Sequence, residues 1–294
     1  MFKFLCVLVV SLTLLIYNSN AYDIDSEALL KLQNRGAQII DVRTFQEVKQ
    51  GSIKGSFNID FLGSKFKDLI QLLDRSSEYV LVCRSGRRSL AALTMMKTLG
   101  FSKVWNYAGG MNRWFEEGRP VNLGINSFEK KISSIEEGII KLETTLGDRL
   151  KAEIANEGLE EAFEICSLEA MSLTEKIKKE LSVDMLKRTS LKLRNPSNRP
   201  SPQELEVLKS IDKTSTLGGF FYSVEYPNIT AYKTLKVKSL CLSCHGSKSN
   251  MTKGVIAKLK KLYPSDQATE YQLGDIRGVI KLVTKFNNSK TSSQ

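Results

Sequence analysis

The sequence predicts an α/β domain, a parallel sheet with helices on both faces, followed by an α+β domain with long N-terminal helices. Up to about residue 123, short apolar runs alternate with helical segments, which is typical of parallel strands joined by helices. After Pro120, long stretches with apolar residues at three- and four-residue spacing predict helices, and β-type segments follow them. A chain of 294 residues is also long enough for two hydrophobic cores.

Strands and helices alternate in the first part of the chain. We expect buried strands at residues 37–43, 79–83 and 103–110, and helices at 66–74 and 89–100, the second of them closed by Gly100. Functional groups in α/β domains lie where strands end and helices begin. The segments that follow these strands are therefore the first places to search for a site.

The second part begins with long helices, which we expect over residues 128–181 because helix-breaking residues are few there. The other expected elements are an irregular loop at 194–202, a helix at 203–212, β-type segments at 218–226 and 231–242, a short helix at 253–262 and a strand at 277–286. Residues 287–294 are a polar tail that we expect to be disordered. We find no internal repeat.

The N-terminus has the features of a cleaved signal peptide, residues 1–21. Lys3 precedes an apolar run over 4–17, and small residues stand at Ser19 and Ala21. The run is shorter than the ~20 residues of a membrane span, although an uncleaved anchor is the alternative. We expect a periplasmic protein with no stable membrane insertion after signal cleavage.

The chain is basic, with 43 Lys and Arg against 32 Asp and Glu. A basic excess can indicate a nucleic-acid or anionic-membrane partner. Here the charges are spread along predicted solvated helical faces, such as residues 176–188, without interleaved aromatic residues. Export also separates the chain from nucleic acid, so we expect no nucleic-acid partner and interpret the charge as favouring solubility and attracting small anions.

Four cysteines remain once signal cleavage removes Cys6: Cys83, Cys166, Cys241 and Cys244. Four cysteines in an exported protein ordinarily predict two disulfides. The local sequence around each one indicates a chemical role instead, and we expect no structural disulfide.

Cys83 opens the segment CRSGRRS, which follows one predicted strand and leads into a helix. Backbone N–H groups at a helix N-terminus and the side chains of Arg84, Arg87 and Arg88 would surround its sulfur. Such a nest stabilises negative charge and lowers the pKa of a thiol. We therefore expect a thiolate or a persulfide anion. A cysteine phosphatase would need C-x5-R, whereas position 89 is serine.

Residues 35–121 resemble a rhodanese domain, and we place this domain at 22–123. The matching motifs are IIDVR, EVKQGSIKGSFNI in place of the usual GHIPGAINI, CRSGRRS and AGGMNRWFEEGRPV. The resemblance implies a sulfurtransferase in which Cys83 takes sulfur from a small anionic donor, thiosulfate, a polysulfide or a persulfide, and passes it to a thiol or cyanide-like acceptor. The implied site also includes Arg84, Ser85, Gly86, Arg87, Arg88 and Ser89. An inactive binding domain is the alternative.

The same resemblance suggests which residues organise this loop. We expect Asp41 and Arg43 to support it from the neighbouring strand end, with Glu47 as a partner of Arg43. Ser52 stands where the family often has histidine, which removes a structural polar group.

The segment CLSCHG, residues 241–246, contains the only histidine of the chain. C-x-x-C-H in an exported protein is typical of covalent attachment of c-type haem through Cys241 and Cys244, with His245 as an iron ligand. A redox pair of cysteines is the alternative. The second axial position stays open on spacing alone: water, an empty site, a methionine (Met171, Met185 or Met251) or Cys166.

Cys166 lies on a predicted amphipathic helix whose apolar residues could line a haem pocket. These residues are Phe163, Ile165, Leu168 and Met171. An isolated cysteine on such a face is more often a small core residue.

Residues 127–286 resemble a bacterial family of unknown function, single-haem c-type proteins related to histidine-kinase sensor domains. The motifs are FEICSLEA, KRTSLKLRNPSNRP, VKSLCLSCHG and LYPSDQATEYQLGDIRG. The resemblance implies a PAS-like α+β domain at 124–286 with one covalent haem c whose iron is held by His245 and Cys166. A thiolate ligand predicts a low reduction potential. Arg194 and Arg277 would either pair with haem propionates or make turn contacts.

The two resemblances together predict an exported haem-containing sulfurtransferase in which sulfur transfer and redox state are coupled, with a possible periplasmic redox partner. Two alternatives remain open. The haem domain could sense redox state, sulfide or a diatomic gas, or it could be an electron carrier with an accessory rhodanese domain.

Overall fold

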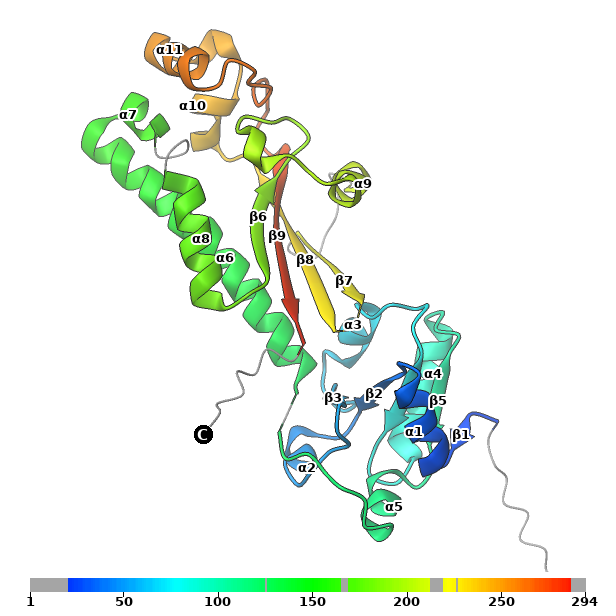
Figure 1. Cartoon of the computed structure of the whole chain (residues 1–294). Helices are drawn as coiled ribbons and strands as arrows, with labels where there is room; N and C mark the ends of the chain where they lie inside the picture. Colours follow the sequence, from blue (N-terminus) through cyan, green and yellow to red (C-terminus); the bar gives the residue numbers. More distant parts are fainter. Residues whose placement is uncertain (1–20, 125, 165–168, 212–218, 226, 287–294) are drawn as a thin grey trace, which may run out of the picture.

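The computed structural model describes residues 21–124, 126–164, 169–211, 219–225 and 227–286. Figure 1 shows an elongated molecule with two separate sheets, which are connected along the chain through the start of helix α6 (Phe128–Glu157). The predicted tail and all but the last residue of the predicted signal peptide lie outside the described residues.

The first sheet has five parallel strands in the order β1-β5-β4-β2-β3. Its strands are β1 (Asp23–Ile24), β2 (Gln38–Asp41), β3 (Phe57–Asn58), β4 (Tyr79–Val82) and β5 (Val104–Tyr107). The helices of this half are α1 (Ser26–Asn34), α2 (Phe45–Val48), α3 (Phe66–Gln71), α4 (Arg87–Thr98) and α5 (Gly110–Glu116).

Helices cover both faces of this sheet, as the sequence predicts. Val80 and Val82 of β4 pack in one apolar cluster with residues of α1 and α5, whereas Tyr79 and Leu81 pack in another with residues of α3 and α4. Alternate side chains of a strand point to opposite faces, so both faces of β4 are buried. The edge strands β1 and β3 have two residues each, too short to produce a detectable pattern.

The second sheet is antiparallel, in the order β6-β9-β8-β7. Its strands are β6 (Met185–Thr189), β7 (Phe220–Glu225), β8 (Asn228–Lys236) and β9 (Ile276–Lys285). The helices of this half, besides α6, are α7 (Leu159–Glu164), α8 (Ala170–Leu181), η2 (Pro196–Asn198), α9 (Pro202–Ser210), η3 (Ser239–Cys241), α10 (Leu242–His245), η4 (Lys248–Asn250) and α11 (Lys253–Leu262). The predicted α+β class is confirmed.

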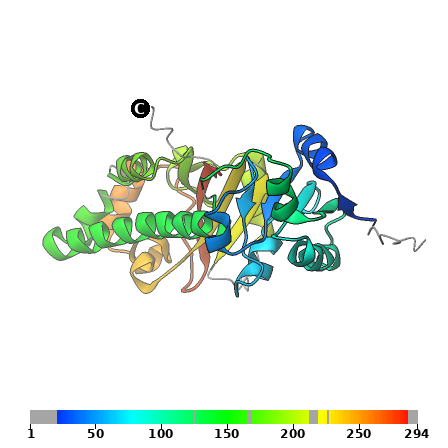
Figure 2. The same cartoon turned by 90° about the horizontal axis from the view of Figure 1, so that it is seen from below.

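Helix α6 packs along one face of this antiparallel sheet. It begins at Ser127, whose hydroxyl accepts a hydrogen bond from the N–H of Lys130. Ile135, Ile139 and Leu142 are buried at helical spacing and share a cluster with Ile280 and Leu282 of β9. Helix α9 covers the opposite face. The views in Figures 1 and 2 agree that α6 extends away from the parallel sheet.

The helices predicted over 128–181 are present as α6, α7 and α8, and α6 is followed by Gly158, whose φ is 94°. Two other sequence predictions about this half need correction. The helical face predicted over 176–188 ends at Ser182, which has φ 51°, and strand β6 follows it. The strand predicted over 231–242 ends at Lys236, because its partner β9 extends no further than Ile276.

An aromatic cluster joins the two halves. The rings of Phe57, Phe128 and Phe286 lie with centroids 5.0 to 5.8 Å apart. The N–H of Asn58 in β3 also donates to the carbonyl of Asn126, at 2.7 Å. The hydrophobic core therefore continues from one sheet to the other.

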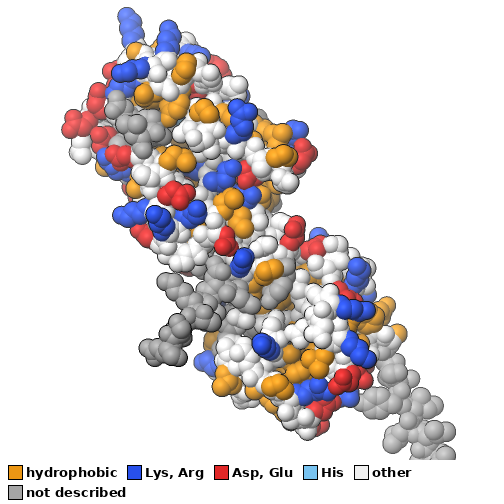
Figure 3. All heavy atoms as spheres, viewed as in Figure 1, with side chains coloured by type: hydrophobic (Ala, Val, Ile, Leu, Met, Phe, Trp, Pro, Cys, Tyr) orange, Lys and Arg blue, Asp and Glu red, His pale blue; other side chains and the backbone are white. Residues whose placement is uncertain are grey.

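The surface carries both signs of charge on each lobe, without a single extended basic face in the view of Figure 3. No helix in the part of the chain that the structure describes is long and apolar enough to cross a membrane.

Candidate functional site

Cys83 lies directly after β4, near the centre of the parallel sheet, and is 1% exposed. Its Sγ accepts hydrogen bonds from the N–H of Gly86 at 3.1 Å and from the hydroxyl of Ser89 at 3.3 Å. Gly86 has φ 92° and leads into α4, so the loop turns back over the sulfur at the helix N-terminus. The predicted loop residues therefore enclose one sulfur atom.

The main chain of α5 fixes this loop from the other side. The N–H of Met111 donates to the carbonyl of Cys83 at 2.8 Å, and the N–H of Asn112 donates to that of Arg84 at 3.0 Å. Only glycine fits at position 110, because an added Cβ would lie 2.3 Å from the Cys83 carbonyl oxygen. The sequence did not reveal this clamp, although the glycine pair at 109–110, where α5 begins, is a turn signal.

Two opposing effects set the pKa of Cys83. Burial raises it, whereas hydrogen bonds from the Ser89 hydroxyl and from the N–H groups of Ser89, Ser85 and Gly86 lower it. The hydrogen bonds dominate, so the pKa of Cys83 lies below its usual range. The loop thus favours the thiolate, the reactive form of the thiol.

The three arginines of the loop have different environments. Arg84 and Arg87 are exposed and line a cavity of about 520 Å³ next to the loop. Arg88 also lines this cavity, but its guanidinium donates to both carboxylate oxygens of Glu47, at 2.8 and 2.5 Å. Arg84 and Arg87 can therefore attract an anionic substrate, whereas Arg88 is already paired with the carboxylate of Glu47.

Asp41 and Arg43 form a buried ion pair at 2.6 Å at the end of β2. Arg43 does contact Glu47, but by donating to its main-chain carbonyl at 3.2 Å. The predicted contact of Arg43 with Glu47 therefore involves the Glu47 main chain. The Glu47 carboxylate pairs with Arg88 instead. Ser52 pairs with Asn122 as an isolated antiparallel bridge.

A cavity of about 470 Å³ lies at the far end of the second half, within the ~300–1,000 Å³ of small-molecule and cofactor sites. One side is α6, from Glu143 to Ile154, and the opposite side includes Leu235, Leu240 and the predicted haem-binding residues Cys241, Cys244 and His245. The sequence contained no signal for the α6 residues, because they face the cavity only once α6 packs beside the segment 235–245.

His245 is prepared to bind a metal through one nitrogen. Its Nδ1 lies 2.7 Å from the carbonyl oxygen of Ala268, which can only accept, so Nδ1 carries the proton and Nε2 keeps its lone pair. Burial and the nearby charges of Arg194 and Arg277 hold the pKa of His245 well below its usual range. The imidazole is therefore neutral, as a metal ligand must be.

Cys241 and Cys244 stand on η3 and α10, on the same side of the cavity as His245. Among the described residues neither forms a disulfide, and neither does Cys83. Two reduced thiols beside a neutral imidazole are the groups that covalent haem attachment requires.

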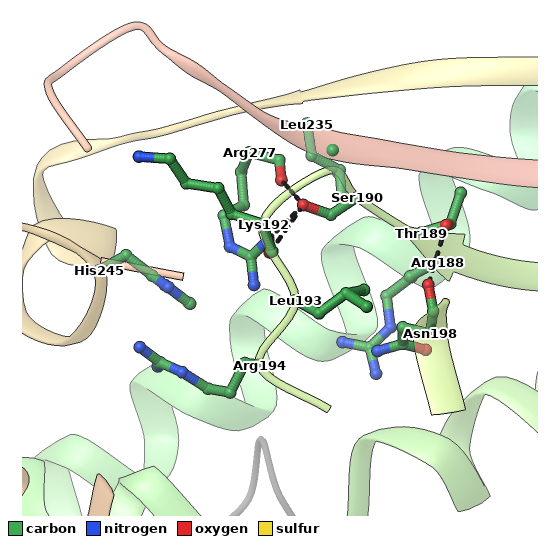
Figure 4. A pocket seen from close by; sticks show the side chains of 11 residues that line it. Arg188, Thr189, Ser190, Lys192, Leu193, Arg194, Asn198, Leu235, His245 and Arg277 are labelled. Carbon is green, nitrogen blue, oxygen red and sulfur yellow. Dashed lines mark hydrogen bonds between the residues drawn. The ribbon is translucent and has the colours of Figure 1, made fainter. Parts of the chain in front are cut away.

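Arg194 and Arg277 line this cavity and a smaller one of about 140 Å³ beside it. Figure 4 shows both guanidinium groups near the ring of His245. Arg194 pairs with Asp266 at 3.1 Å, and Arg277 donates to the hydroxyl of Ser190 at 2.8 Å. The Nε of Arg277 is buried and has no hydrogen-bond partner within the described residues, so the wall retains a donor that a carboxylate would satisfy.

The predicted second ligand, Cys166, lies outside the described residues, as do Ile165 and Leu168. Phe163, near the end of α7, does line the cavity, whereas Met171 does not. The other methionine candidates, Met185 and Met251, are also absent from its lining.

The sulfur loop and the cavity lie at opposite ends of the molecule. Figure 1 places the β4–α4 loop in the lower lobe and α10 at the far end of the upper lobe. Helix α6 has 30 residues, so it is about 45 Å long and separates the two places.

Two protein families match this chain. The rhodanese-like domain matches residues 25–117, and the Tll0287-like family matches residues 90–284. A curated relative is thiosulfate sulfurtransferase GlpE of Pseudomonas aeruginosa, 34% identical over 88 residues, which are 30% of this chain and 78% of that protein.

Solved structures resemble each half. A rhodanese-related protein of Thermoplasma volcanium is 32% identical and covers 35% of this chain and 98% of its own, with a TM-score of 0.32. The cyanobacterial heme-protein Tll0287 is 22% identical and covers 53% of this chain and 94% of its own, with a TM-score of 0.43.

Proposed function

Because the chain belongs to both the rhodanese-like and the Tll0287-like families, we propose that it is an exported haem-containing sulfurtransferase. Cys83 carries sulfane sulfur, and the second domain holds one covalent haem c of low potential. The observation that carries the first part is the ring of donors around the Cys83 sulfur, formed by Gly86 and Ser89.

The transfer occurs in two steps. The Cys83 thiolate attacks the outer sulfur of thiosulfate, a new S–S bond forms, the S–S bond of the donor breaks, and sulfite leaves with the electron pair. The persulfide anion then occupies the loop, where backbone N–H groups stabilise its charge. A thiol or cyanide-like acceptor attacks the outer sulfur, and the Cys83 thiolate is regenerated.

Residues around the mouth of the loop would select the donor. Arg84 and Arg87 are exposed beside the cavity over Cys83, where they would attract a small anion and hold it near the thiolate. The neutral side chain of Asn112 lines the same cavity.

A thiosulfate–cyanide assay tests the sulfurtransferase. Cys83→Ser should lower turnover at least about a thousandfold, because the hydroxyl is a poor nucleophile here. The Cys241→Ser variant is the matched control, since it changes a cysteine in the other half and should retain transfer. Equal turnover in the wild type and Cys83→Ser would exclude the proposed carrier.

The far cavity fits a haem. Cys241 and Cys244 provide thiols for the two vinyl groups, His245 provides a neutral Nε2, and the buried Arg277 Nε suits a propionate. Leu150, Ile154 and Phe163 supply apolar contacts for a porphyrin face. A haem bound there would supply a one-electron redox centre.

We further propose Cys166 as the second iron ligand. It follows the end of α7 by two residues, and Phe163 of that helix already lines the cavity. Absorption and EPR spectra of Cys166→Ala test this ligand: a change from low-spin to high-spin iron is expected, and Cys83→Ser serves as the control with unchanged spectra. An unchanged low-spin spectrum in Cys166→Ala would exclude the thiolate.

The coupling between the two halves involves a periplasmic redox partner. The β4–α4 loop and α10 lie in different lobes of the molecule (Figure 1). This separation favours electron exchange with a partner over a direct reaction of the haem with the Cys83 sulfur of the same chain. Fractionation of cells, followed by detection of covalent haem in the periplasmic extract, tests the proposed location.

A further inference from the structure

Glu47 and Arg88 form a pair that connects two helices beside the sulfur loop. The guanidinium donates through Nη1 to Oε2 at 2.8 Å and through Nη2 to Oε1 at 2.5 Å, a two-pronged contact between α2 and α4. Both side chains are about three-quarters buried, at 22% and 26% exposed. A contact with this geometry holds the guanidinium in one orientation.

The Glu47 side of the pair is itself fixed. Its carboxylate accepts hydrogen bonds from the N–H of Thr44 at 3.0 Å and from the Thr44 hydroxyl at 2.9 Å, as part of the capping box that begins α2. Its carbonyl accepts from Arg43, which is anchored by the buried ion pair with Asp41. The end of β2 and the start of α2 thus place this carboxylate.

Arg88 lies next to the residues that hydrogen-bond to the Cys83 sulfur. It precedes Ser89, whose hydroxyl donates to the Cys83 sulfur, and it lines the cavity in front of the loop. The hydrogen bond from Glu47 raises the pKa of Arg88, and the negative charges of Glu47, of Cys83 as thiolate and of Asp60 act in the same direction.

Other charged groups around Arg88 and the loop come from four segments. The loop contributes Arg84 and the first turn of α4 contributes Arg87, both exposed. The end of β2 contributes the Asp41–Arg43 pair, and the segment after β3 contributes Asp60. Arg88 differs from Arg84 and Arg87 in that its guanidinium donates to both oxygens of one carboxylate, that of Glu47.

We propose that Glu47 is a positioning residue that holds Arg88 against the cavity wall and neutralises its guanidinium. The hydrogen bonds of the loop and of Ser89, and not a mobile cation, then determine the reactivity of the Cys83 sulfur. This inference rests on the proposed role of Cys83 as sulfur carrier. An unrestrained guanidinium would turn toward the thiolate, stabilise it and cover it, which makes it a weaker nucleophile.

The Glu47→Gln variant tests this proposal with the full-length protein. Glutamine still accepts from the Thr44 N–H, so the start of α2 is retained. We expect the pH profile of Cys83 alkylation by iodoacetamide to shift down by about 0.5 to 1 unit, because Arg88 gains an uncompensated charge near the sulfur. The limiting alkylation rate at high pH should fall a few-fold.

Two further variants make the result specific. Glu117→Gln removes a carboxylate that also pairs with an arginine of this domain, Arg113 at 2.8 Å, and should leave the alkylation profile unchanged. Glu47→Gln combined with Arg88→Met should return the profile to within about 0.3 unit of the wild type, since the cation is then gone. If Glu47→Gln does not fold, Arg88→Met alone should shift the profile upward.

An alkylation profile of Glu47→Gln that matches the wild type, or an equal shift in Glu117→Gln, would overturn the proposal. Alkylation measures the thiol without any sulfur donor. A shifted profile in a protein that never turns over thiosulfate would therefore refute the proposed sulfurtransferase and leave the role of Glu47 standing.

Discussion

The sulfur loop and the far cavity are built in different ways. The loop consists of consecutive residues, Cys83 to Ser89, and its donors to the sulfur are mostly backbone N–H groups. The cavity is assembled from α6, α7, the end of β8 and α10, and its walls are side chains. A loop fixed by main-chain contacts resists change, whereas walls made of side chains can adjust.

The contacts around two glycines show this difference. At Gly110 an added Cβ would meet the backbone of the sulfur loop. At Gly254 of α11, which packs against α7 outside the cavity lining, it would meet the carboxylate of Glu160. Backbone cannot move aside locally, but a carboxylate on a flexible side chain can. The sulfur site should therefore be the more rigid of the two.

The largest expected effect tests whether the two regions are energetically independent. Phe128→Ala removes a fully buried ring from the aromatic cluster between the halves and should lower the free energy of unfolding by about 3–5 kcal/mol. Both tryptophans, Trp105 and Trp114, lie in the first half, so their fluorescence reports on that half alone. Circular dichroism reports on the helices of both halves, of which the longest, α6, lies in the second.

In Phe128→Ala we expect the two probes to separate into distinct unfolding transitions. Phe115→Ala, with a ring 43% exposed, is the control and should change stability by no more than about 0.5 kcal/mol. Coincident transitions in Phe128→Ala would show that the cluster does not couple the regions.

The next effect sharpens the comparison at the sulfur site. Gly110→Ala should lower the free energy of unfolding by about 3 kcal/mol, because φ is +58° and the new Cβ would overlap the Cys83 carbonyl. Gly118→Ala is the matched control: φ is +63°, but no atom lies within 4 Å, so about 1 kcal/mol is expected. Denaturant titration measures both, and equal losses would remove the argument for a clamp.

The corresponding change in the second domain should be small. Gly254→Ala displaces the Glu160 carboxylate and its 3.1 Å hydrogen bond with the Thr252 hydroxyl, a loss of about 1 kcal/mol that better helix propensity partly offsets. The thermal midpoint and the haem absorbance of the purified protein should stay close to those of the wild type. A loss above about 2 kcal/mol would mean that the contact between α7 and α11 is as rigid as the sulfur loop.

The smallest effect is a dependence on pH. Arg88 and Thr44 lower the pKa of Glu47 to about 2, below its unfolded value near 4.3. A carboxylate with a depressed folded-state pKa stabilises the protein above its unfolded pKa, and this stability is lost as pH falls from about 4.3 toward 2. Because the pair is partly exposed, we expect at most about 1 kcal/mol at pH 7.

Unfolding titrations of wild type and Glu47→Gln at pH 7, 4 and 2.5 measure this dependence. The difference between the two proteins should shrink toward zero at the lowest pH, and it should be absent throughout in an Arg88→Met background. A difference that stays constant with pH would show that the Glu47 charge does not contribute.

The sequence predicted most of the elements that have strong periodicity. The buried strands β2, β4 and β5 and the long α6 were predicted because each presents a continuous apolar run or a helical stripe. Strand β6 was missed, because Lys187 and Arg188 give it a charged pattern and only Leu186 and Thr189 of its residues are buried. Its pairing with β9 overrides that local pattern.

The two sites also differ in how far local sequence predicts them. The Cys83 loop follows from its own residues, since a short loop between a strand and a helix brings its N–H groups onto one sulfur. The carboxylate that pairs with Arg88 could not be assigned from the sequence, because Glu47 is 41 positions from Arg88 along the chain and only 4 from Arg43.

By itself the sequence determined which sulfur atoms are available for chemistry and where the local loop and the C-x-x-C-H segment place them. Only the tertiary structure decided that Arg277 and α6 complete the cavity around His245, that Glu47 neutralises Arg88, and that the two sites lie at opposite ends of the molecule. The physical reason is range: backbone geometry over a few residues is local, whereas burial and charge pairing depend on residues that are distant along the chain.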